Sequence, residues 1–231
     1  MNRNSLMYWF PLIKDLDIPM PKTVTTFINR DYMVQVLDGK KDWTKEFEDS
    51  VKSLAWAISY PLFLRTDMAS GKHGWRTTCY VESEDELLSH IAGVLDCNET
   101  NIFMGMDPYE ALVFREFIPL DSRFTAFQGL PIAKERRYFV KDGEVLCHHP
   151  YWVEDAVERG RPKEEKWRSL LAEINKEQEA EVALLTSYSK EVSEVLDGYW
   201  SIDFAKAKTG RWFLIDCALG NRSWHPECDL R

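Results

Sequence analysis

The stretch that most constrains the fold lies near the C-terminus, where two segments alternate between inward-type and outward-type residues. Residues 199–205 read YWSIDFA, and residues 211–217 read RWFLIDC. A period of two with aromatic and β-branched residues predicts two strands, and a tight turn at Thr209–Gly210 would join them as a hairpin. In the register that we expect, Asp203 faces Asp216. The expected pairs on the other face are Phe204 with Ile215 and Ile202 with Cys217.

Two carboxylates directly opposite each other destabilise a sheet unless something lies between them. A cation explains such a pair, and the carboxylates of Asp203 and Asp216 suit a hard, oxygen-binding ion such as Mg²⁺. A slightly different register would leave two solvated acids, and the hairpin alone does not decide between these interpretations.

Composition restricts the class of protein. A chain of 231 residues with 45% hydrophobic residues can bury a core, as one large domain or as two lobes. No apolar run is long enough to span a membrane. The five cysteines are odd in number and widely spaced, which favours a reduced, cytoplasmic setting.

The net charge of −9 disfavours a nucleic-acid binder. The basic residues are nevertheless uneven, and such groups within an acidic chain indicate a small anionic ligand, with ordinary surface scatter as the alternative. The groups are Arg65, Lys72 and Arg76, and then Arg115, Arg123, Lys134, Arg136 and Arg137.

Helical and strand patterns alternate along the chain, which predicts the α+β class. We expect two lobes, residues 1–113 and residues 114–231. Helices are expected at residues 43–58, after a capping box at Ser83–Glu86, and over most of 154–196. Strands are expected at 61–65, 76–81, 111–118, 123–128, 135–141 and 144–149.

Three motifs upstream of the hairpin carry further chemistry. Arg65 ends a short strand, and the loop Ser70–Gly74 contains Lys72 between two glycines, which suits a polyphosphate, although a surface turn is an alternative. The apolar strand within 112–119 becomes charged at its end and could present its backbone edge to adenine. In 135–143, a period of two separates Glu135, Arg137 and Phe139 from Arg136, Tyr138 and Val140, which also fits a half-exposed strand with a salt bridge.

The order of these motifs, an Arg–Gly loop, FREFI, ERRYFVKDG and SIDFA…WFLIDCALGN, resembles the ATP-grasp superfamily. The chain is most similar to the branch in which arginine replaces the usual phosphate-binding lysine. It is also similar to the translation-initiation assembly factors that carry this fold. The resemblance covers about residues 19–221 and implies ATP-grasp lobes that hold the nucleotide between antiparallel sheets.

The resemblance implies a role for each matching residue. Arg65 would contact the α- and β-phosphates of ATP, and Lys72 would add a contact from the loop that closes over them. Glu116, Phe117 and Ile118 would form the adenine hinge, Glu135 would bind the ribose, and Arg137 would face the γ-phosphate and the acceptor. Asp203 and Asp216 would bind Mg²⁺. Together these roles imply ATP and Mg²⁺ as cofactors and Arg65, Lys72 and Arg137 as the catalytic cations.

The chain departs from the family in one place that bears on the metal. Ala218 stands where an asparagine usually follows the second acid, and Asn221 could replace it only if the backbone bends. One metal ligand and the number of metal ions are therefore open.

Three functions remain open at this stage. The first is an ATP-dependent ligase that joins a carboxylate to an amine or thiol through an acyl phosphate. The second is an ATP-binding assembly chaperone that forms no new bond, and the third is a kinase. The acceptor is not identified by the residues, and a peptide or protein end is one candidate. Residues with an open acceptor-site interpretation are His148, His149, Arg222, Trp224 and His225.

Overall fold

The computed structural model describes residues 2–226 and groups the chain into two compact units. The N-terminal unit comprises Pro21–Ile118 and Phe127–Leu130, and the C-terminal unit comprises Met1–Met20, Pro119–Ala126 and Pro131–Arg231. The first residues join the C-terminal unit because their helix α1 (Leu6–Ile13) contacts α7 (Glu179–Val195) and β10 (Trp212–Leu219). This grouping differs from the division at residue 113 that the sequence suggested, and that division stays a prediction.

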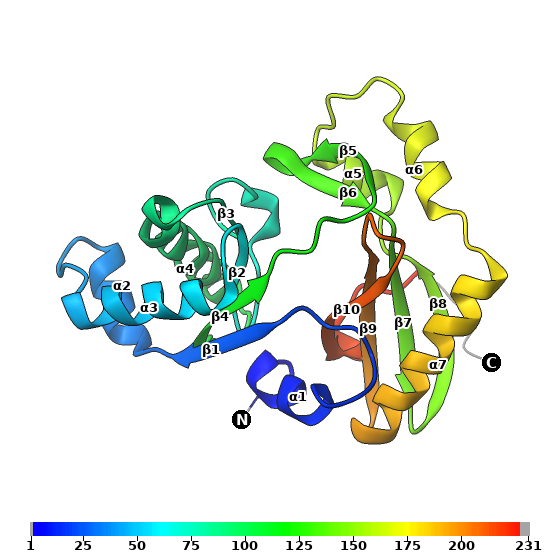
Figure 1. The fold of residues 1–231 in the computed structure, drawn as a ribbon, viewed down its shortest axis with the longest axis horizontal. Helices are drawn as coiled ribbons and strands as arrows, with labels where there is room; N and C mark the ends of the chain where they lie inside the picture. Colours follow the sequence, from blue (N-terminus) through cyan, green and yellow to red (C-terminus); the bar gives the residue numbers. More distant parts are fainter. Residues whose placement is uncertain (1, 227–231) are drawn as a thin grey trace. The chain divides into compact units, whose positions relative to one another are not determined.

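The N-terminal unit is built on a four-stranded antiparallel sheet in the order β1-β4-β2-β3 (Figure 1). Its strands are β1 (Thr23–Phe27), β2 (Leu62–Thr66), β3 (Tyr80–Val81) and β4 (Ala111–Glu116). Its helices are α2 (Arg30–Leu37), α3 (Lys45–Ile58) and α4 (Leu87–Phe103), with 3-10 turns η1 (Lys72–Gly74), η2 (Glu84–Glu86) and η3 (Phe127–Gly129).

The core of this unit lies between one face of the sheet and the helices. Strand residues such as Leu64 and Phe114 share an apolar cluster with Val51 of α3 and Ile91 of α4, and all four are fully buried. Alternation then places Phe63, Arg65 and Arg115 on the opposite face, because side chains of a strand alternate between the two faces. The packing of the core therefore holds the two arginines of β2 and β4 on the opposite face of the sheet.

Two expectations about this unit are corrected. The strand predicted at 76–81 is reduced to Tyr80–Val81, because residues 75–79 form turns that lead back from η1. Ser83 makes no side-chain cap; instead Glu86 accepts a hydrogen bond from the backbone N–H of Glu82 at 3.1 Å, and helix α4 begins one turn later at Leu87.

The C-terminal unit contains a second antiparallel sheet in the order β10-β9-β7-β8 and a two-stranded sheet of β5 and β6 (Figure 1). The strands are β5 (Ser122–Ala126), β6 (Leu130–Ala133), β7 (Glu135–Lys141), β8 (Glu144–Pro150), β9 (Tyr199–Lys206) and β10 (Trp212–Leu219). The remaining elements are α5 (Glu154–Arg159), α6 (Trp167–Asn175) and η4 (Gly220–Arg222). Within residues 2–226, no helix combines the length and hydrophobicity that a membrane span requires.

Candidate functional site

The two aspartates that anchor the sequence argument lie directly opposite each other in the β9–β10 hairpin, as predicted. The predicted pairing of Ile202 with Cys217 is also confirmed, but the pairing of Phe204 with Ile215 is wrong, because Phe204 pairs with Leu214. A β-bulge at Ile215 inserts one residue before Asp216. Without it Asp216 would fall opposite Ile202, on the other face of the sheet.

The sheet register extends this pair into a row of four polar residues. Asp203 pairs with Arg137 of β7, and Arg137 pairs in turn with His149 of β8. Directly opposite residues point to the same face of a sheet, so Asp216, Asp203, Arg137 and His149 share one face in that order. Sequence reasoning expected the two aspartates to meet but gave no register for β7 or β8.

A two-pronged ion pair joins the middle of this row. The Nε and Nη2 atoms of Arg137 donate to the two carboxylate oxygens of Asp203, each at 2.7 Å. The side chains are only 13% and 10% exposed. Burial alone would lower the pKa of Arg137, but the charge of Asp203 and its hydrogen bonds outweigh burial and raise the pKa above its ordinary value.

The two aspartates fit Mg²⁺ as partial ligands. No group of three or more histidine, cysteine, aspartate or glutamate residues suited to a metal occurs among residues 2–226. Mg²⁺ typically takes one or two carboxylates and completes its shell with phosphate oxygens and water, so Asp203 and Asp216 suffice for this mode. Ala218 pairs with Ser201 and contributes no side-chain oxygen, while Asn221 lies exposed where the backbone turns in η4.

Glu135, the expected ribose ligand, is 4% exposed. One oxygen of its carboxylate accepts a hydrogen bond from the indole N–H of Trp152 at 2.9 Å, and its carbonyl accepts one from the backbone N–H of Tyr151 at 3.1 Å. In this structure Glu135 therefore anchors the segment that follows β8. Its role toward ribose stays a prediction.

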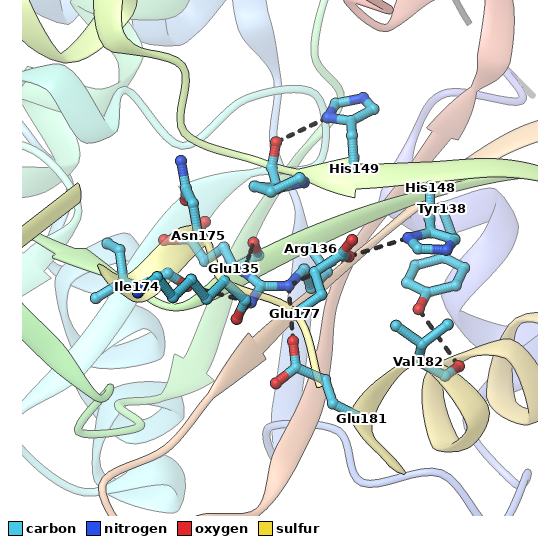
Figure 2. A network of polar contacts seen from close by, with 12 residues as sticks. Glu135, Arg136, Tyr138, His148, His149, Ile174, Asn175, Glu177, Glu181 and Val182 are labelled. Atoms are coloured by element: carbon cyan, nitrogen blue, oxygen red, sulfur yellow. Dashed lines mark hydrogen bonds and ion pairs between the residues drawn. The ribbon is translucent and has the colours of Figure 1, made fainter. Parts of the chain in front are cut away.

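Arg136 points to the opposite face and forms a buried network that the sequence did not reveal (Figure 2). It is fully buried, and its Nε donates to Glu181 at 2.7 Å. Its Nη2 donates to the carbonyls of Ile174 and Lys176, at 3.1 and 3.0 Å. Arg136 thus attaches the end of α6 and the start of α7 to β7, and it leaves Arg137 facing the other way.

In the N-terminal unit the structure brings Arg65 and Lys72 close to one thiol. Burial raises the pKa of Cys79 to about 12, while the positive charges of Lys72 and Arg65 act in the opposite direction. Arg65 is 4% exposed, and its Nε donates to the carbonyl of Thr66 at 2.9 Å. The expected phosphate-binding cations of this unit therefore lie in one neighbourhood.

The Ser70–Gly74 loop is folded into turns. Gly71 adopts a left-handed conformation with φ of 62°, and its carbonyl accepts hydrogen bonds from Gly74 N–H at 2.9 Å and Thr78 Oγ1 at 2.8 Å. A Cβ atom at Gly71 would also lie 3.2 Å from the sulfur of Cys97. Both the φ angle and the close packing explain why glycine occupies this position.

The expected adenine hinge lies where β4 ends. Glu116 is the last residue of the strand, and its backbone N–H donates to the carbonyl of Lys22 at 2.8 Å. Phe117 and Ile118 lie beyond the strand ladder, as a hinge requires. The ring of Phe117 lies 5.0 Å from that of Tyr80, which in turn stacks on Trp75 at 5.4 Å. The sequence did not indicate this aromatic cluster.

Residues after β10 cover part of the polar row. The carbonyl of Trp224 accepts a hydrogen bond from Arg137 Nη1 at 3.4 Å, and its ring meets His149 edge-on at 5.5 Å. His225 lies 3.0 Å from the sulfur of Cys147 and 4.1 Å from the ring of Phe139. His148 points away from this face, stacks on Tyr138 and lies 3.0 Å from Glu177.

Comparisons with known proteins agree with this architecture. The structure is similar to that of C-terminally truncated Cdc123 from Schizosaccharomyces pombe, with a TM-score of 0.60 and 14% identity over 94% of this chain and 83% of that one. It is similar to a RimK domain ATP-grasp protein from Sphaerobacter thermophilus, with a TM-score of 0.50, 16% identity, and coverage of 94% and 59%.

A third similar structure is N5-carboxyaminoimidazole synthase from Aspergillus clavatus in complex with ADP and a ribonucleotide. It gives a TM-score of 0.50 and 12% identity over 93% of this chain and 43% of that one. The chain therefore spans less than two thirds of these two ATP-grasp proteins, and identities this low establish the fold alone. No curated protein matches the sequence.

A family model for an ATP-grasp domain, the third family of its clade, matches residues 53–231. The match takes in more than half of the chain and includes every candidate site residue. The superfamily and the α+β ATP-grasp fold expected from the motifs are confirmed. The chain belongs to this family of ATP-grasp domains.

Proposed function

We propose that this chain is a Mg-ATP-dependent ligase that joins a carboxylate to an amine or thiol through an acyl phosphate. The observation that carries the proposal is the row in which Asp216, Asp203 and Arg137 share one sheet face. Two carboxylates beside a guanidinium match the needs of phosphoryl transfer, which depends on positioning and on offsetting charge.

Each residue has a distinct task in this proposal. Asp203 and Asp216 would hold Mg²⁺, which supplies charge neutralisation to the β- and γ-phosphates when bound. Arg137 would switch part of its hydrogen bonding from Asp203 to the γ-phosphate. Arg65 and Lys72 would bind the α- and β-phosphates, Glu116–Ile118 would bind adenine through the backbone, and Glu135 would bind ribose.

The test is release of ADP and phosphate from Mg-ATP in the presence of a panel of amino acids and short peptides. We expect release that depends on one member of the panel, and a hydroxamate product when hydroxylamine traps the acyl phosphate. The double variant Asp203→Asn/Asp216→Asn should abolish release. Unchanged ATP affinity and turnover in that variant would refute the proposal.

An ATP-binding assembly chaperone is the second candidate. Two observations favour it: the similarity to Cdc123, and Ala218 in place of a third oxygen ligand. This function predicts ATP binding without acceptor-dependent ADP release, together with a stable protein complex. A phosphorylated product in the same assay would instead identify a kinase.

A further inference from the structure

One ring nitrogen on the polar row has no role in the site described so far. His149 is 9% exposed, and its Nδ1 lies 2.7 Å from the carbonyl of Pro150. Because a carbonyl only accepts hydrogen bonds, Nδ1 carries the hydrogen and Nε2 holds a lone pair. This Nε2 is buried and makes no hydrogen bond to any residue of the described range 2–226. A buried acceptor without a donor costs roughly 1–3 kcal/mol, so it calls for an explanation.

The charges around His149 keep the ring neutral. Burial lowers its pKa most, the backbone hydrogen bond to Pro150 raises it, Arg137 and His225 lower it, and Asp203 raises it. The ring therefore carries a lone pair at neutral pH rather than a second proton.

The neighbouring imidazoles are already engaged. His225 places its Nε2 3.0 Å from the sulfur of Cys147, and His148 lies 3.0 Å from Glu177 on the opposite face. Among these three rings, His149 is the one with a buried nitrogen that is open to a donor.

The segment that buries this nitrogen is lightly attached. Trp224 meets His149 through a ring edge and is itself 54% exposed, and its carbonyl is held by Arg137 across a long 3.4 Å. A small ligand that donates an N–H can therefore replace the Trp224 contact and reach both Arg137 and His149.

We propose that His149 Nε2 binds the nucleophilic amine and accepts its proton. This proposal rests on the proposed ligase function and narrows the nucleophile to an amine. The amine nitrogen attacks the acyl carbon of the acyl phosphate, the C–N bond forms, and the C–O bond to phosphate breaks with its electron pair leaving on phosphate. The proton that the nitrogen loses passes to Nε2, which leaves His149 as an imidazolium.

The test uses the full chain labelled with ¹⁵N at histidine, with glycinamide as the probe amine, with and without Mg-ATP. We expect glycinamide to move the His149 Nε2 resonance saturably toward its protonated position. Trp224→Ala should tighten this binding. His149→Gln should abolish saturable binding of glycinamide measured by calorimetry, whereas the control His148→Gln should keep it.

An unmoved His149 resonance under both conditions would overturn the proposal, as would equal glycinamide binding by His149→Gln. Mg-ATP binding is measured on the same samples, and its outcome bears on the ligase function alone. The two proposals can therefore fail separately, because a glycinamide-dependent shift without nucleotide supports the amine site even where Mg-ATP does not bind.

Discussion

The ion pair between Arg137 and Asp203 gives the sharpest prediction about stability. Asp203→Asn keeps the shape of the side chain but removes its charge, so it leaves a nearly buried guanidinium without its carboxylate. Removing one partner of a buried pair costs about 3–5 kcal/mol. Because the side chains retain 13% and 10% exposure, we expect about 3 kcal/mol, the lower end. Stabilities of whole domains are only about 5–15 kcal/mol.

The assay is urea unfolding followed by tryptophan fluorescence, on wild type, Asp203→Asn, Arg137→Met and the double variant. The double variant should lose less than the sum of the single losses, by about 1–3 kcal/mol, because the second change removes the charge that the first left uncompensated. The control is Arg168→Met, whose pair with Glu154 at 2.6 Å has side chains 54% and 57% exposed and should matter by less than about 1 kcal/mol.

The reasoning would be refuted if Asp203→Asn destabilised the chain no more than Arg168→Met does. Strict additivity in the double variant would refute it as well, since it would mean that the two side chains do not interact.

Three further predictions concern other parts of the fold. Gly93→Ala should destabilise by about 1–3 kcal/mol in urea, despite a helix-propensity gain of about 1 kcal/mol, because its Cβ would lie 2.0 Å from the carbonyl of Thr77; equal stability of Gly93→Ala and the exposed control Asp96→Ala would contradict this. Cys79, buried and with its pKa raised to about 12, should react with iodoacetamide at neutral pH only after unfolding, and early labelling seen by mass spectrometry would contradict this. Because burial lowers the pKa of His149, the unfolded chain binds more protons below about pH 6.5, so the free energy of unfolding should fall from about pH 7 to pH 5 and fall less in His149→Phe; an equal slope in both would contradict this.

Local patterns predicted much of the fold. The period of two in 199–205 and 211–217 is enough to predict the hairpin, and the helical stripe in 43–58 predicts α3, which spans Lys45–Ile58. These signals depend on neighbours in sequence, so they can be identified without knowledge of tertiary contacts. The pairing of Asp203 with Asp216 was also accessible, because a tight turn at Thr209–Gly210 brings the two strands together in that register.

Long-range features were not accessible from one sequence. The bulge at Ile215 depends on how β10 packs, and an alternating pattern cannot show an inserted residue. The opposite fates of Arg136 and Arg137 follow from alternation, but their partners Glu181 and Asp203 lie 45 and 66 residues away. The open nitrogen of His149 depends on Pro150 and on Trp224, so the sequence could suggest the residue but not its role.

The central claim is that the face carrying Asp216, Asp203 and Arg137 binds Mg-ATP. Isothermal titration calorimetry of Mg-ATP against wild type and Asp216→Asn tests it most directly, because this change leaves the Arg137–Asp203 pair intact. Asp197→Asn, an exposed position before β9, is the matched control. We predict binding by wild type and by Asp197→Asn, and at least a tenfold loss in Asp216→Asn, equivalent to about 1.4 kcal/mol. Equal affinity of Asp216→Asn and wild type, or no binding by wild type, would contradict the account.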